Sequence, residues 1–185
     1  MSWTADPAQI VQRMQQSTGR PARVYEAVLE ILRQNLIPVL DQLGFIPQDR
    51  RAHVYPKAYH LAGENIGEPN DAKGWPRIIV GGAIQEEEFA MGWQDTIQVS
   101  VTVAWPGPVI GRREFVESLD VACVCSGIFR YPQFHGAFED PDNPGEILWY
   151  QMMPAGYSLV PPDWKHYSGW IAHLLARQSP GSNLW

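Results

Sequence analysis

Cysteine is scarce in this sequence, with only Cys123 and Cys125 present. The two are separated by one residue, so they do not form the CxxC pair that many zinc and redox sites use. On a helix, side chains at this spacing point in different directions and cannot easily bridge each other. We therefore expect small, buried or half-buried thiols in a reducing cytoplasm, not a disulfide or a metal site.

Positive charge is also in deficit. Lys and Arg total 14 against 20 Asp and Glu, which gives a net charge of −6. The densest basic groups are the pairs Arg50-Arg51 and Arg112-Arg113. A protein that grips nucleic acid needs an excess of basic side chains to neutralise phosphates. The composition therefore argues against sequence-specific DNA binding.

Long apolar runs are missing from the sequence. None approaches the roughly 20 residues that cross a bilayer as a helix. Residues 1–7 have neither the basic region nor the apolar region of a signal peptide. The sequence thus predicts a protein that is neither exported nor held in a membrane.

Apolar residues, proline and glycine are plentiful by contrast. Hydrophobic residues make up 45% of the chain, which is enough for a core and argues against disorder. The 16 prolines and 16 glycines imply many turns and argue against an all-helical bundle. The range 1–185 has the size of a single domain.

Two segments have the pattern of helices. Residues 22–43 carry apolar side chains at three- and four-residue spacing, with Pro21 at the start and Gly44 at the end. Pro38 lies inside this pattern, so we expect a kink or a break near Asn35. A second helix is predicted over 112–129. Its apolar face would comprise Phe115, Val116, Leu119, Ala122, Cys123 and Ser126.

Four segments have the pattern of strands. Residues 75–83 contain the stretch Arg77-Ile78-Ile79-Val80, which ends at two glycines. Residues 93–105 alternate between apolar and small or polar side chains, which predicts an antiparallel strand with one core face and one polar face. A further strand is expected at 146–153. The apolar run 169–176 allows a buried strand or a short helix, and its flanking glycine and aromatic residues favour the strand.

These elements predict an α+β fold, with a small, mostly antiparallel sheet, two main helices packed on one face and long loop insertions. The Gln-rich residues 1–20 are expected to form an N-terminal arm or a short helix. The segments 46–75 and 132–168 show no sustained periodicity. We predict that they are long loop excursions, which often serve interactions.

No familiar catalytic motif occurs. The GxSxG, HExxH, Walker A and GxGxxG patterns are all missing from the sequence. The five histidines are scattered and do not share with carboxylates the spacing that a zinc site requires. We therefore assign no catalytic residue, no metal site and no cofactor.

Two acidic clusters come nearest to a site. Glu86, Glu87 and Glu88 lie between two expected strands. Because consecutive strand residues point to alternate faces, the three carboxylates cannot easily converge on one cation. They are more typical of a solvated hairpin tip. Residues 140–147 begin like an EF-hand loop, but the twelfth place holds Gln151 instead of a bidentate glutamate. The alternative is a small metal-dependent hydrolase that uses both clusters, through Glu86, Glu87, Glu88, Asp140 and Asp142.

Aromatic residues are the more informative feature. The 8 tryptophans and 7 tyrosines are more than we expect one core to bury, and several stand beside glycine or proline. Aromatic side chains next to turns are common in oligomeric and protein–protein interfaces. The candidate interface residues are Tyr55, Tyr59, Trp75 and Trp93.

The order of the elements resembles a known family. A helix, a strand reading Trp75-Pro76-Arg77-Ile78-Ile79-Val80-Gly81, a long alternating strand over 95–103 and a helix beginning near Arg113 resemble the tail terminator proteins of tailed bacteriophages. The resemblance covers about residues 22–130 and rests on element order and strand pattern.

The resemblance implies a structural virion protein of the head–tail junction, made in the cytoplasm of the bacterial host. Copies of the chain would form a ring, expected to be a hexamer, that caps the tail tube. Its partners would be the tail tube protein and a neck, stopper or connector protein. DNA would pass through the lumen without specific binding, and Glu86, Glu87 and Glu88 are candidates for an acidic lumen or tip. Another neck or connector protein is the alternative within this class.

Overall fold

The computed structural model describes residues 21–64, 74–82, 96–107, 110–161 and 166–178. The helices are α2 (Pro21–Leu43), α3 (Gln48–Val54), α4 (Arg112–Ile128) and α5 (Pro132–His135). The strands are β1 (Ala58–Leu61), β2 (Arg77–Gly81), β3 (Thr96–Pro106), β4 (Phe138–Glu139), β5 (Ile147–Trp149), β6 (Gln151–Leu159) and β7 (Tyr167–Arg177). The expected arm at 1–20 lies outside the described residues.

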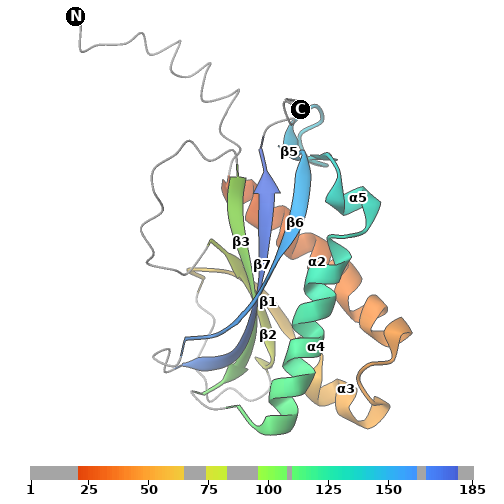
Figure 1. The fold of residues 1–185 in the computed structure, drawn as a ribbon, viewed down its shortest axis with the longest axis vertical. Helices are drawn as coiled ribbons and strands as arrows, with labels where there is room; N and C mark the ends of the chain where they lie inside the picture. Colours follow the sequence, from red (N-terminus) through yellow and green to blue (C-terminus); the bar gives the residue numbers. More distant parts are fainter. Residues whose placement is uncertain (1–20, 65–73, 83–95, 108–109, 162–165, 179–185) are drawn as a thin grey trace, which may run out of the picture.

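Five strands form one sheet in the order β1-β2-β3-β7-β6, with α2 and α4 side by side on one face (Figure 1). β1 runs parallel to β2, and all other neighbours in this sheet are antiparallel. β4 and β5 form a separate antiparallel pair. The predicted α+β class, with a mostly antiparallel sheet and two main helices on one face, is confirmed.

α2 is a continuous helix whose spacing places one apolar stripe against the sheet and α4. Its fully buried side chains are Val24, Val28, Leu32, Leu36 and Leu40. The expected break near Asn35 does not occur. Pro38 removes one backbone donor, but Pro38 and Gln34, whose carbonyl loses its partner, are both exposed, so water can satisfy that carbonyl.

α4 presents to the core a different face from the predicted one. Val121, Val124 and Cys125 are buried, whereas Val116 is 52% exposed and Cys123 is exposed as well. The apolar face predicted from the sequence is therefore wrong at Val116 and Cys123. The helix instead buries Glu117 and Ser118, which form hydrogen bonds with Arg50 and with the Phe115 carbonyl, and a pattern based on hydrophobicity alone does not anticipate this.

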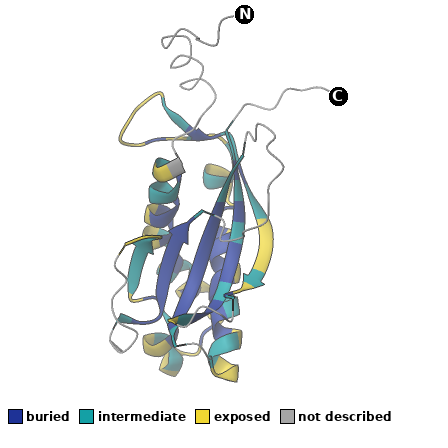
Figure 2. Ribbon diagram, turned by 90° about the vertical axis from the view of Figure 1, so that its left-hand side faces the viewer, coloured by how far each residue is buried: buried dark blue, intermediate teal, exposed yellow. Residues whose placement is uncertain are grey.

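The long strand β3 is buried on both faces (Figure 2). Val99, Val101 and Val103 face the helices, as predicted, and are at most 1% exposed. Ser100 and Thr102 point to the opposite face, yet each is only 2% exposed. The second face is polar at these two positions, as predicted, but it is not exposed, because these side chains are small and uncharged and can be covered.

On this second face, Trp75, Ile79 and Ala104 form a small apolar cluster, with Tyr167 packed against it. The cluster is separate from the main core, which includes residues of all the long elements from α2 to β7. The central strands of the sheet therefore separate two apolar layers, and no described helix covers the second face (Figure 2).

The predicted loop excursions contain regular structure. The segment 46–75 includes α3 and the short edge strand β1, and the segment 132–168 includes α5, β4, β5 and β6. The predicted strand at 146–153 is divided at Tyr150 between the two sheets. These elements are short, and their pairing partners are distant in the sequence, so local periodicity does not reveal them.

Candidate functional site

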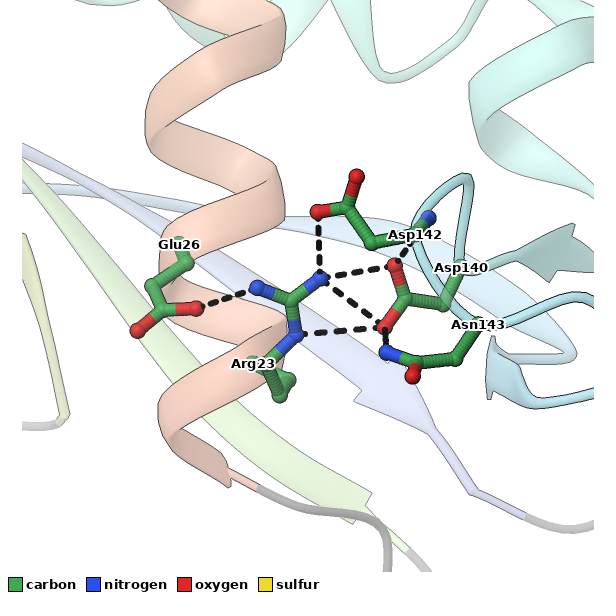
Figure 3. A network of polar contacts seen from close by, with 5 residues as sticks. All are labelled: Arg23, Glu26, Asp140, Asp142 and Asn143. Carbon is green, nitrogen blue, oxygen red and sulfur yellow. Dashed lines mark hydrogen bonds and ion pairs between the residues drawn. The ribbon is translucent and has the colours of Figure 1, made fainter.

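A cluster of ion pairs fixes the start of α2 to the loop between β4 and β5 (Figure 3). The Nη2 atom of Arg23 lies 2.7 Å from Oδ1 of Asp140, and its Nε lies 3.1 Å from Oδ2. The same guanidinium also bonds Glu26 at 2.6 Å and Asp142 at 3.0 Å. Asn143 donates its side-chain amide to Asp140 at 2.8 Å. The loop that resembled an EF-hand is thus a structural clamp around one arginine.

The Asp140 carboxylate is committed to this clamp. Its side chain is fully buried, and the hydrogen bonds from Arg23, followed by those from Asn143 and the Asp142 backbone, lower its pKa to about 2. A carboxylate held in this way has a cation already in place. Asp140 is therefore a poor candidate for the metal ligand that the hydrolase alternative requires.

A second network fixes α3 against α4. Arg50 donates to both carboxylate oxygens of Glu117, at 3.0 and 2.7 Å, and also reaches Glu114 at 3.1 Å. Arg113, one turn earlier in α4, also forms an ion pair with Glu117. Hydrogen bonds from Arg50 are the main cause that lowers the pKa of Glu117. The buried Glu117 thus explains the unexpected orientation of α4.

The three predicted interface residues that the structure describes are not brought together on one exposed surface. Trp75 is 3% exposed and lies under the Arg77 guanidinium, whose central carbon is 4.5 Å from the Trp75 ring centroid, so the single chain does not present Trp75 on its surface. Tyr59 is half-buried against the main core, and burial raises its pKa to about 12. Trp93 and the acidic residues Glu86, Glu87 and Glu88 lie outside the described residues.

Tyr55 has a local structural role. It is half-buried, and its hydroxyl donates a hydrogen bond of 2.8 Å to Asp41 near the end of α2. Burial and this carboxylate raise the pKa of Tyr55 to about 12. Arg51 forms an ion pair of 2.7 Å with the same carboxylate. Together they fix the turn between α2 and α3.

An apolar groove of about 640 Å³ lies between the ends of α2, α4 and α5, which we call the α2–α4–α5 groove. Leu43, Phe45 and Tyr131 on its walls are 47%, 55% and 60% exposed. Cys123 and Gly127 of α4 also line it, and nothing lies within 4 Å of the position of a Cβ on Gly127. The described residues that line the groove include no charged side chain.

The walls of this groove are held in place from behind. Ile46, next to Phe45, is 1% exposed, and the contacts of Asp41 fix the turn that carries both. On the opposite wall, Trp149 donates its indole N–H to the Phe134 carbonyl at 2.9 Å. A ring nitrogen of His135 lies 2.7 Å from the Met152 carbonyl oxygen. The exposed apolar side chains are thus presented on a fixed surface, which is a common property of binding sites.

No sequence pattern predicts this groove. The apolar spacing in 22–43 places Leu43 on the buried side of the predicted helix, and no sequence pattern marks Phe45 or Tyr131. The only sequence signal is that a large apolar residue follows within two positions of each helix end, Phe45 after Gly44 and Tyr131 after Phe129. Among the residues that the structure describes, no three His, Cys, Asp or Glu side chains are grouped closely enough to hold a metal ion. None of the described helices has the length and apolar character needed to cross a bilayer.

Comparison with known proteins gives no relative. No family model matches the chain, and neither a curated protein nor a solved structure matches it significantly.

Proposed function

We propose that this protein is a structural subunit that assembles with copies of itself into a ring, and that this ring is the tail terminator of a tailed bacteriophage. It would cap the tail tube and join it to a neck, stopper or connector protein in the virion. DNA would pass through the ring without being bound specifically.

The observation that carries the proposal is the exposed apolar groove between α2, α4 and α5. Three large side chains, Leu43, Phe45 and Tyr131, are each about half exposed on walls that hydrogen bonds hold fixed. A surface of this kind is stabilised when another protein covers it. The phage assignment rests on the resemblance in element order, with which the sheet β2-β3-β7 and the helices α2 and α4 are compatible.

Imaging of the assembled protein tests this function. The full chain would be purified and viewed by negative-stain electron microscopy, alone and with tubes of a tail tube protein encoded in the same genome. We expect closed rings, and we expect the chain at one end of each tube. A monomer that does not bind the tube ends, or a metal-dependent hydrolytic activity without tail association, would overturn the proposal.

A further inference from the structure

Arg77 is a buried cation on the second face of the sheet, the face that no described helix covers (Figure 2). The residue is only 5% exposed. Its Nε donates a hydrogen bond of 2.7 Å to the Gly74 carbonyl, and its guanidinium carbon lies 4.5 Å from the Trp75 ring centroid. Within the described part of the chain, no carboxylate lies at ion-pair distance from Arg77, and its Nη1 and Nη2 groups have no hydrogen-bond acceptor.

The strand neighbours of Arg77 cannot supply the missing acceptor. Ala58 of β1 and Ala104 of β3 stand opposite it in the sheet, and neither has a polar side chain. On the remaining side, a Cβ on Gly74 would collide with Nη2 of Arg77. The guanidinium is therefore held in place by the Gly74 backbone and the Trp75 ring, while most of its N–H donors stay unused.

Trp75 adds a second unused donor beside the first. The residue is 3% exposed, and its buried indole N–H has no acceptor among the residues that the structure describes. Arginine and indole side chains donate hydrogen bonds but do not accept them, so they cannot satisfy each other. A buried cation without a counter-ion is strongly unfavourable, and the contact with the ring offsets only part of this cost. Both groups thus require an acceptor that carries negative charge.

We infer that Arg77 and Trp75 form a binding site for a small oxyanion, a free carboxylate or phosphate. A planar guanidinium binds either group through two parallel N–H donors, and the unused groups of Arg77 can supply them. Because both residues are almost fully buried, the site admits a small anion but not a broad surface of a protein or of DNA. The inference concerns the single chain and does not depend on the proposed ring.

Unfolding at increasing anion concentration tests for this site. The protein would be denatured with urea in sodium phosphate or sodium acetate, with sodium chloride added to keep the ionic strength constant. An anion that binds only the folded state should raise the folding equilibrium constant about 100-fold at about 100 times its dissociation constant. We expect a saturable stabilisation with at least one of the two anions. The anion that binds more tightly shows whether the natural ligand carries a phosphate or a carboxylate.

Replacement of Arg77 by lysine separates specific binding from a general effect of salt. Arg77→Lys keeps the positive charge but removes the planar fork, so it should weaken anion binding about tenfold or more. Arg33→Lys is the matched control, because the Arg33 side chain is 52% exposed and pairs with Glu30 on α2. The control should bind the anion with the affinity of the parent. Equal affinities in the two variants would overturn the inference.

The indole N–H of Trp75 gives a readout that does not require the Arg77 variant to fold. Nitrogen–proton correlation spectra show the indole signals of the 8 tryptophans, and Trp75→Phe identifies the signal of Trp75. In the parent protein this signal should shift saturably as the anion is added, and the other indole signals should shift less. If neither phosphate nor acetate shifts it, Arg77 already has a counter-ion within the chain, and the inference is overturned.

Discussion

Arg23 donates hydrogen bonds to both carboxylate oxygens of Asp140, which lies 117 residues later in the chain. The contact joins the first turn of α2 to the loop between β4 and β5 (Figure 3). The Asp140 side chain is fully buried, while that of Arg23 remains 27% exposed. The pair therefore combines a desolvated carboxylate with a guanidinium that water still reaches, and its contribution to stability should depend on pH.

Replacement of Asp140 by asparagine tests this contribution. The pKa of Asp140 falls from its ordinary 3.8 to about 2 in the folded protein, so folding favours the ionised carboxylate. The stabilisation is fully present above about pH 4 and is lost as the pH falls through about 2. Asp140→Asn should lower the free energy of unfolding by about 2 kcal/mol at neutral pH, and the difference should shrink in acid.

Urea denaturation at several pH values measures this effect. Asp142→Asn is the matched control, because the Asp142 side chain is 78% exposed and its ion pair with Arg23 is open to solvent. We expect this control to cost less than about 1 kcal/mol. Equal effects of the two substitutions, or a difference that does not change with pH, would contradict the role given to Asp140.

Substitutions on the two faces of β3 should be more alike than the sequence predicts. The alternating pattern implies that Val101→Asp unfolds the protein while Thr102→Asp is mild. Because Thr102 is 2% exposed, we expect both substitutions to cost more than about 3 kcal/mol. Ala155→Asp, at an exposed position of the edge strand β6, is the control and should cost little.

Substitution of Ser100, on the same face of β3 as Thr102, should cost little when the new side chain is apolar. The Ser100 hydroxyl is buried and has no hydrogen-bond partner among the residues that the structure describes. Ser100→Ala should therefore change the free energy of unfolding by less than about 1 kcal/mol or stabilise the protein slightly. Thermal or urea unfolding of the three β3 variants would show whether burial or polarity determines the cost. A Thr102→Asp variant as stable as the parent would mean that this face is not covered.

Elements with long local repeats could be predicted from the sequence, whereas elements that depend on contacts between distant segments could not. The repeats in 22–43 and 97–105 extend over many residues, so α2 and β3 could be predicted from the sequence. β1 could not, because Ala58–Leu61 is only four residues long and its strand character comes from pairing with β2. Such pairing depends on segments that are distant in the sequence.

The candidate site was harder to predict for a related reason. The orientation of α4 is set partly by the buried ion pair of Glu117 with Arg50, two residues that hydrophobic periodicity places on the surface. As a result Cys123 faces the groove instead of the core. The tryptophan count suggested an exposed aromatic surface, but Trp75 and Trp149 are buried. The exposed large apolar residues that line the groove are Leu43, Phe45 and Tyr131, which no motif marks.

The two cysteines should differ in reactivity if α4 is oriented as the structure shows. Cys123 is exposed, whereas Cys125 is buried and burial raises the pKa of its thiol. In native protein under conditions that keep subunits apart, a thiol reagent should label one site per chain quickly, and the second only after denaturant is added. Mass spectrometry of the labelled peptides identifies the site. Rapid labelling of Cys125, or none at Cys123, would mean that α4 faces the other way.

Gly169 should be one of the least replaceable residues of the sheet. It lies in β7 opposite Ala104 of β3, with a φ of +139°, a backbone conformation that residues with a side chain rarely adopt. A Cβ at this position would also collide with the carbonyl oxygen of Val103. Because that oxygen belongs to the backbone of the central strand, it cannot move without disturbing the pairing of β3 with its neighbours.

Gly169→Ala should therefore lower the free energy of unfolding by at least about 2 kcal/mol. Gly127→Ala is the control, since Gly127 lies in α4 with open space around its Cβ position. Alanine there should be neutral or should stabilise the helix by up to about 1 kcal/mol. Urea unfolding of both variants measures the contrast. If Gly169→Ala were as stable as Gly127→Ala, the close approach of β7 to β3 at this position would be wrong, and with it the register between the two longest strands.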